Sequence, residues 1–249
     1  MNPNSEHNPI IKIENIYKKY GEKTVLDGFN LQLYDGENLV IMGKSGSGKS
    51  VMIKCLIGLE TPDSGTIEIM NQKTNNLSRE NLNNIRSDIG FLFQGSALYD
   101  SMTVRENLEF PLRRHLAKFG NVKNMLPLVK EALQNVGLEH VINLMPNELS
   151  GGMQRRVALA RTLILKPRII IYDEPTTGLD PITSKEIILL MKSVQEKYKT
   201  SSIIITHDID CARVIANRMA LLIDGKNYAE GTFAELSTSQ DPKVKAFFK

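Results

Sequence analysis

The chain has 249 residues, of which 41% are hydrophobic and 24% charged, and its formal net charge is +3. This is the composition of an ordinary globular protein with room for one large domain or a core with a subdomain, which excludes the disordered and fibrous classes. The near balance of charge argues against a nucleic-acid surface, so no nucleic acid is expected as a partner.

The N-terminal residues 1–9 contain neither a basic segment nor an apolar segment, so they do not form a signal peptide. The longest apolar stretches, such as 187–191, are far shorter than the roughly 20 residues of a membrane-spanning helix. Cys55 and Cys211 lie far apart and outside any Cys-x-x-Cys pair, which indicates two free thiols. The sequence therefore predicts a cytosolic protein that reaches a membrane only through a partner.

The first third of the chain reads as strands that lead into a glycine-rich loop. Residues 10–14 alternate, and 25–33 are rich in β-branched and apolar residues. Residues 38–42 are a short apolar run that ends at Gly43, which is the pattern of a buried strand. A helix is expected at 49–59.

The chain changes character between about Thr103 and Leu165. Apolar residues recur at three- and four-residue spacing from Val122 to Val136, and Gly137 follows as the expected C-cap. This stretch is predicted to be helical and to lie between two parts that are rich in strands.

Strands and helices alternate again after this insertion. Residues 168–173 and 202–206 are apolar strands, and 181–199 is a helix that Asp180 caps. Residues 219–230 read as a hairpin. The pattern predicts an α/β fold with a parallel sheet covered on both faces, in which ligands bind beyond the carboxyl ends of the strands.

The loop after strand 38–42 matches the phosphate-binding pattern G-x-x-x-x-G-K-S/T. Its glycines let the main chain turn tightly with N–H groups pointing inward, and the N-terminus of the next helix adds partial positive charge. Lys49 is expected to reach the β- and γ-phosphates of a nucleotide, and Ser50 is expected to bind Mg²⁺. The loop consists of Gly43, Lys44, Ser45, Gly46, Ser47, Gly48, Lys49 and Ser50.

A second half of this site follows strand 168–173. Asp173 ends the strand at the position where P-loop enzymes hold Mg²⁺, and Glu174 comes next, where it could orient and deprotonate a water molecule. Two acids at a strand end could also be merely solvated. Together with the glycine-rich loop they predict a site for phosphoryl chemistry.

The run Leu149-Ser150-Gly151-Gly152-Met153-Gln154 resembles the signature loop of the ABC ATPases, at the start of a helix expected to extend to Leu165. Two glycines at a helix N-terminus form a second phosphate receptor. One position departs from the family pattern, because Met153 stands where Gln is usual and lacks its amide. The resemblance implies that Ser150 and the glycines make the phosphate contacts. We therefore expect ATP to bind although Met153 replaces the usual Gln.

Further matches follow in the order of the ABC family. Gln94 resembles the Q-loop glutamine, 178–180 resembles the D-loop, and His207 resembles the switch histidine. Tyr20 resembles the aromatic residue that stacks on adenine, although Tyr17 competes with it. Each of these residues also has an ordinary role when taken alone, as a cap, a loop residue or a strand end.

The resemblance covers almost the whole chain and implies a P-loop NTPase fold of ABC type. It implies an ATP-binding core of residues 10–93 and 166–249, whose mixed sheet is joined by an antiparallel N-terminal β part, and an inserted helical subdomain of residues 94–165. It also implies that two copies pack head to tail with ATP between them.

The ligands implied by the resemblance are ATP and Mg²⁺. Catalysis is assigned to Glu174, His207 and Gln94. The metal is assigned to Ser50, Gln94 and Asp173. Binding of ATP is assigned to Tyr20, Gly43, Lys44, Ser45, Gly46, Ser47, Gly48, Lys49, Ser50, Ser150, Gly151, Gly152 and Asp180.

Residues 93–104 bear on the kind of transporter. In ABC transporters the residues after the Q-loop glutamine contact the permease, and Gly95–Tyr99 pairs small residues with an apolar and an aromatic one, which suits docking of a helix. This stretch, with 145–153, 180–183 and 241–248, resembles the ATPase subunits of MCE-type lipid transporters. It implies an integral membrane permease docking near Gly95–Tyr99, an MCE-domain protein in the complex, and a position at the inner face of the cytoplasmic membrane.

Two other functions stay open at this point. One is an importer ATPase for amino acids or another small solute. The other is a soluble ABC ATPase switch, against which the single cassette and the lack of a long coiled-coil insertion argue. The C-terminal stretch 241–248 is expected to form a short helix whose apolar residues Val244, Phe247 and Phe248 cover either the chain's own core or a partner.

Overall fold

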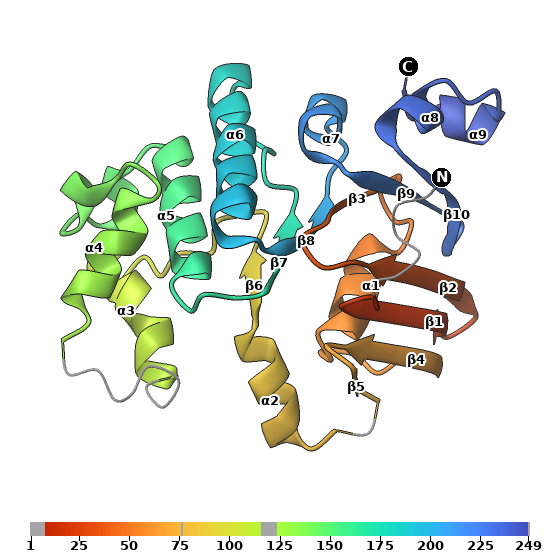
Figure 1. The fold of residues 1–249 in the computed structure, drawn as a ribbon, viewed down its shortest axis with the longest axis horizontal. Helices are drawn as coiled ribbons and strands as arrows, with labels where there is room; N and C mark the ends of the chain where they lie inside the picture. The colour runs from red at the N-terminus through yellow and green to blue at the C-terminus, as the bar shows by residue number, and fades with distance from the viewer. Residues whose placement is uncertain (1–7, 76, 116–123, 249) are drawn as a thin grey trace.

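The computed structural model describes residues 8–75, 77–115 and 124–248. Within these ranges the strands form two sheets, shown in Figure 1. Their bounds are β1 (Ile11–Tyr20), β2 (Lys23–Leu33), β3 (Asn38–Met42), β4 (Ser64–Ile69), β5 (Gln72–Lys73), β6 (Ile89–Leu92), β7 (Ile169–Asp173), β8 (Ser201–Ile205), β9 (Arg218–Ile223) and β10 (Lys226–Gly231).

The helices of the described ranges begin mostly at a Ser, Thr or Asp whose side chain accepts a hydrogen bond from the first turn. Their bounds are α1 (Lys49–Leu56), α2 (Arg79–Ser87), α3 (Val104–Arg114), α4 (Leu126–Gln134), α5 (Gly151–Leu163), α6 (Pro181–Tyr198), α7 (Ile209–Ile215), α8 (Phe233–Ser237) and α9 (Pro242–Lys245), with short 3₁₀ turns η2 (Glu139–Val141) and η3 (Pro146–Glu148).

Three predicted helix ends differ from the structure. The helix expected at 49–59 ends at Leu56, and α5 ends at Leu163 instead of Leu165. The helix expected from Val122 to Val136 is α4, and Val122 itself lies outside the described residues. Its C-cap is Asn135, whereas Gly137, at a φ of 71°, reverses the chain two residues later. After α4 and α5 the apolar periodicity continues past the helix because Val136 and Ile164 also pack on the core, whereas Leu59 after α1 is exposed.

The larger sheet has the strand order β10-β9-β3-β8-β7-β6 and is mixed, since β10 is antiparallel to β9 while the other neighbours are parallel. β3 and β8 are buried along their whole length, which explains their continuous apolar runs. Because β3, β7 and β8 are parallel, the residues after them meet at one edge of the sheet. These residues are Gly43, Asp173 to Glu174, and Thr206 to His207.

The smaller sheet has the order β2-β1-β4-β5 and its pairings are antiparallel. α1 lies between the two sheets in Figure 1 and buries Met52, Ile53 and Leu56 in a cluster shared by both. The packing of α1 therefore fixes the loop before it against both sheets.

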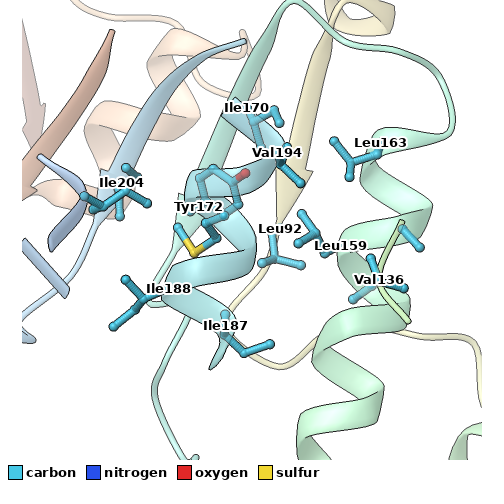
Figure 2. Close-up of a cluster of buried hydrophobic side chains, with 14 of the residues drawn as sticks. Leu92, Val136, Leu159, Leu163, Ile170, Tyr172, Ile187, Ile188, Val194 and Ile204 are labelled. Atoms are coloured by element: carbon cyan, nitrogen blue, oxygen red, sulfur yellow. The ribbon is translucent and has the colours of Figure 1, made fainter. Parts of the chain in front are cut away.

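The opposite face of the larger sheet is covered by α5 and α6. Figure 2 shows Leu159 of α5 and Ile187 of α6 meeting Leu92 and Tyr172 of the sheet, with Val136 from the end of the α4 region beside them. In Figure 1, α3, α4 and α5 gather on the side away from the small sheet. All three fall within residues 94–165, and the strands of the described ranges fall outside them.

The C-terminal segment folds onto the chain's own core. Asp241 caps α9, Val244 is buried, and Phe248 packs edge-on against Phe233 with ring centroids 5.6 Å apart. Of the two alternatives for this segment, the structure supports docking on the chain itself.

Two smaller expectations concern the membrane and the thiols. In the described part of the chain, no helix has the length and hydrophobicity that crossing a bilayer requires. Cys55 and Cys211 are free, as predicted, and both are buried.

Candidate functional site

The loop between β3 and α1 is built on glycines that no other residue could replace without strain. Gly48 has a φ of 107°, and a Cβ there would lie 2.8 Å from the carbonyl oxygen of Val25. A Cβ on Gly43 would lie 2.5 Å from Oγ of Ser47. Gly48 also caps α1 without any side-chain acceptor, so the first N–H groups of α1 remain available to a ligand.

Lys49 folds back over this loop. Its Nζ donates hydrogen bonds to the carbonyl oxygens of Gly43 (2.6 Å) and Lys44 (3.1 Å). Burial lowers the pKa of Lys49, and the charges of Glu174 and Asp173 oppose part of that shift. The ammonium group is thus held where the loop N–H groups and the carboxylates meet.

Asp173 and Glu174 end β7 beside this lysine. Burial and then the charge of Glu174 raise the pKa of Asp173, while Lys49 acts in the opposite direction. Glu174 has a φ of 50°, a left-handed conformation that is strained for a residue with a Cβ. Its N–H donates to the carbonyl oxygen of Ile205 at 2.8 Å, so the neighbouring strand β8 holds it in this conformation.

The side chain of Glu174 is held by two neighbours. Nδ1 of His207 lies 2.8 Å from its Oε2, and the hydroxyl of Thr177 donates to the same oxygen at 3.3 Å. The Glu174 side chain is 13% exposed and the His207 side chain 70%. His207 therefore lies between the partly buried carboxylate and the solvent.

These groups line one open cavity of about 700 Å³. Tyr20 is on its wall and is 46% exposed, whereas the Tyr17 hydroxyl lies against Gly28 and Tyr17 is not among the lining residues. The cavity is lined by Tyr20, Lys23, Val25, Gly43, Lys44, Ser45, Gly46, Gly48, Lys49, Ser50, Val51, Gln94, Asp173, Glu174 and His207. Ser47 does not line it, because its hydroxyl is turned toward Gly43 and buried.

The signature residues lie outside this cavity, at the start of α5. Ser150 caps the helix by accepting a hydrogen bond from the N–H of Met153 at 3.3 Å. Gly152 lies so close to α6 that a Cβ would come within 2.5 Å of Cγ2 of Thr183. Asp180 caps α6 through Ile182 and Thr183. The starts of α5 and α6 therefore form a second cluster, separate from the first.

Met153, the residue that departs from the family pattern, is partly buried and packs against the core. The next residue, Gln154, carries the amide that Met153 lacks. Nε2 of Gln154 donates to the carbonyl oxygens of Pro146 (3.0 Å) and Leu149 (3.3 Å). Gln154 thus fixes the loop that leads into Ser150, a role that could not be assigned from the sequence.

Arg155 is a second residue whose role the sequence did not reveal. It is only 3% exposed, and its guanidinium donates to the carbonyl oxygens of Phe93 and Gln94. An arginine on a helix is normally read as exposed, and its acceptors come from a distant part of the chain, so the sequence carried no signal for it.

The cavity combines the groups that phosphoryl transfer needs. It offers main-chain N–H groups and an ammonium for phosphate, and a partly buried carboxylate next to a histidine. The hydroxyl of Ser50, the carboxylate of Asp173 and the amide of Gln94 are hard oxygen donors, the type that Mg²⁺ prefers.

The chain is similar to known ATP-binding cassettes. A family model described as ABC transporter matches residues 26–177. The intermembrane phospholipid transport system ATP-binding protein MlaF of Haemophilus influenzae is 39% identical over 96% of this chain and 90% of its own length. The methionine import ATP-binding protein MetN of Campylobacter jejuni is 35% identical, over 96% of this chain and 75% of its own length.

A solved structure is similar to this chain in both fold and sequence. The dimeric, post-hydrolysis state of the ATP-binding cassette MJ0796 bound to ADP and Pi matches with a TM-score of 0.78 at 37% identity, over 90% of this chain and 98% of that one. The family match, the relatives and the shared fold lead to one conclusion: the chain belongs to the ABC transporter family and is one of its ATP-binding and ATP-hydrolysing subunits.

Proposed function

We propose that the chain works as a head-to-tail dimer with ATP sandwiched between the loop before α1 of one copy and the start of α5 of the other. The observation that carries this proposal is the separation of the two clusters. The cavity holds one phosphate receptor, and Ser150 to Gly152 form another that does not line it. A second copy would bring the two receptors to the same nucleotide, and the similar cassette MJ0796 is dimeric with ADP and Pi.

Within each site, the loop N–H groups and Lys49 would bind the phosphates, and Tyr20 would stack on adenine. Ser50, Gln94 and Asp173 would hold Mg²⁺. The metal would supply positive charge to the oxygens of the β- and γ-phosphates.

Hydrolysis in this proposal depends on Glu174. Its carboxylate would orient the attacking water and take its proton, while His207 keeps the carboxylate in place and faces the γ-phosphate. Asp180, at the start of α6, would lie at the dimer interface. Most of the catalytic effect would come from positioning and electrostatics, with little covalent chemistry.

The permease would dock on residues 95–99, immediately after Gln94. Tyr99 is 43% exposed, and its ring lies against Phe110 with centroids 4.9 Å apart. Leu98 packs partly on the core beside it. Through this contact the subunit would lie at the inner face of the cytoplasmic membrane.

The transported substrate is proposed to be phospholipid or another apolar molecule, with an MCE-domain protein in the complex. The similarity to MlaF, whose name specifies intermembrane phospholipid transport, supports this. A second candidate is import of an amino acid, which the similarity to MetN supports.

Isolation of the native complex from membranes tests the proposal. We expect a permease and an MCE-domain protein to co-purify with the chain. A permease with a solute receptor would instead establish the importer, and recovery without any membrane protein would contradict both.

The docking surface is tested in the same preparation. Leu98→Asp and Tyr99→Asp should leave the subunit folded but remove the permease from the complex. Leu189→Asp is the matched control, since Leu189 is an exposed apolar residue on α6. Full assembly of both docking variants would place the permease elsewhere.

A further inference from the structure

The main chain that links the cavity to the proposed docking surface is held by two arginines of α5. Nη1 of Arg155 donates to the carbonyl oxygen of Phe93 at 2.6 Å, and its Nη2 donates to that of Gln94. The same Nη2 lies 3.4 Å from the carbonyl oxygen of Thr177, in the segment after Glu174. One guanidinium thus joins the residues around Gln94 to those around Glu174.

Arg161 holds the next part of the same loop. Its Nη1 donates to the carbonyl oxygen of Ala97 at 2.8 Å and its Nη2 to that of Ser96 at 3.1 Å. Its guanidinium also lies 5.7 Å from the centre of the Tyr99 ring. Ser96 and Ala97 have φ values of 60° and 49°, so two consecutive residues with a Cβ adopt the left-handed conformation. Arg161 binds the two carbonyls that this strained stretch presents.

These arginines carry an energetic cost that their contacts only partly offset. Burial lowers the pKa of both guanidinium groups. No carboxylate in the described ranges forms a salt bridge with either of them, and Nε of Arg155 has no hydrogen-bond partner there. An apolar side chain of similar size would avoid the cost of burying a charge. Their contribution therefore lies in the main-chain atoms that they hold.

We propose that Arg155 and Arg161 are positioning residues that fasten residues 93–99 to α5 as one unit. The two side chains start about 9 Å apart along the helix axis, at about 1.5 Å per residue, so they hold the loop at two points. The unit then includes Gln94 in the cavity, Tyr99 on the docking surface and Ser150 at the start of α5. This inference rests on the proposed function, which gives those three residues their roles.

Replacement by lysine tests Arg155. Lysine keeps the charge, but its single ammonium cannot replace the planar guanidinium group, which contacts three carbonyl oxygens. Gln94 would therefore no longer be held in position. We expect Arg155→Lys to lower kcat for ATP by about 10- to 100-fold, which is typical for a misplaced catalytic group, and to leave KM within about twofold. Arg156→Lys is the control, because Arg156 pairs with Glu186 at 2.5 Å and has no hydrogen bond to residues 93–97.

A double-mutant cycle with Gln94→Ala separates positioning from a general loss of stability. If Arg155 acts through Gln94, adding Arg155→Lys to Gln94→Ala lowers kcat no further. Independent effects that multiply in kcat would refute the claim that Arg155 positions Gln94 for hydrolysis.

Amide hydrogen exchange measures directly whether Arg155 and Arg161 hold residues 93–99 against α5, whatever Gln94 does in catalysis. We call this set of arginine contacts the clamp. Residues 93–99 should exchange faster in Arg155→Lys and in Arg161→Lys than in Arg156→Lys or the unchanged protein. Unchanged exchange in both variants would refute the clamp. If exchange rises as expected but Gln94→Ala hydrolyses ATP at the normal rate, the clamp stands and the role proposed for Gln94 fails.

Discussion

Two helices of this protein have glycines at their N-terminal ends, and the difference between these ends suits the shared ATP site that we propose. The N-cap residue of α1 is Gly48, which has a left-handed conformation and no side chain to cap the helix. The N-cap residue of α5 is Ser150, which is extended, and its hydroxyl already accepts a hydrogen bond from the first turn.

The surroundings of the two helix starts also differ, because one is open to a cavity and the other is packed against a helix. The start of α1 faces a cavity with Lys49, Asp173 and Glu174, whereas Gly152 at the start of α5 presses against Thr183 of α6. A phosphate at α1 would meet the ammonium of Lys49 and the carboxylates that we propose as metal ligand and catalytic base. A phosphate at α5 would meet a hydroxyl and a helix dipole only, which suits the second half of a shared site.

The largest expected effect concerns the carboxylate of Glu174 in the α1 cluster. Glu174→Gln keeps the size of the side chain but cannot take a proton, so turnover should fall by about 10²–10⁴-fold while ATP binding changes little. Phosphate release and equilibrium ATP binding measure the two effects. Glu186→Gln, on an exposed part of α6, should leave turnover unchanged.

A second substitution weakens the α1 receptor directly. Lys49→Ala removes the ammonium beside the loop, and loss of a charged hydrogen bond worth about 1.5–3 kcal/mol should reduce ATP affinity by about 10- to 100-fold. Calorimetric titration of the folded variant measures this. Lys54→Ala, one turn further along α1, is the control, because Lys54 is exposed and does not line the cavity. Equal affinity of the Lys49 variant and its control would refute the role of the loop.

A third substitution tests the α5 receptor. A Cβ on Gly151 would find only an ordinary contact, 3.7 Å from Leu179, so Gly151→Ala should fold normally. The methyl group would stand where the second copy's phosphate approaches. We expect ATP affinity of the monomer to stay within about twofold and kcat to fall about tenfold, or about 1.4 kcal/mol in the barrier. Normal kcat would show that no phosphate comes close to Gly151.

The smallest effect is on stability. The pKa of Asp173 is raised in the fold, so its contribution is favourable at low pH and is lost as pH rises through the folded-state pKa. Asp173→Asn should therefore raise the Tm of the nucleotide-free protein, by a few degrees if about 1 kcal/mol is involved, and the gain should grow with pH and then level off. Thermal unfolding from below the ordinary pKa of an aspartate, 3.8, up to neutral pH measures it. A gain that shrinks as pH rises would contradict the direction of the shift.

The α1 cluster was easier to foresee from the sequence than the contacts around α5. Gly43, Asp173 and His207 each follow an apolar run, and parallel strands bring such positions to one edge of a sheet. The cap at Asp180 and the docked C-terminal helix also follow local patterns, although only the structure shows that the C-terminal segment covers the chain's own core.

The arginines of α5 could not be foreseen, because their partners are main-chain carbonyls about sixty residues earlier, and a carbonyl carries no sequence signal. The close approach of Gly152 to Thr183 was hidden for a similar reason, since it depends on how α5 packs on α6. The C-terminal ends of α1, α4 and α5 were missed by two or three residues because apolar loop residues continue the helical pattern.

The most direct test of the shared site is the oligomeric state of Glu174→Gln with Mg²⁺ and ATP, measured by light scattering. Blocked hydrolysis should leave ATP between the two clusters, so the variant should have the mass of a dimer, while the unchanged protein without its permease should be mostly monomeric. Adding Gly151→Ala to this variant should reduce the dimer fraction. A Glu174→Gln variant that binds ATP but stays monomeric at every protein concentration would contradict the head-to-tail dimer.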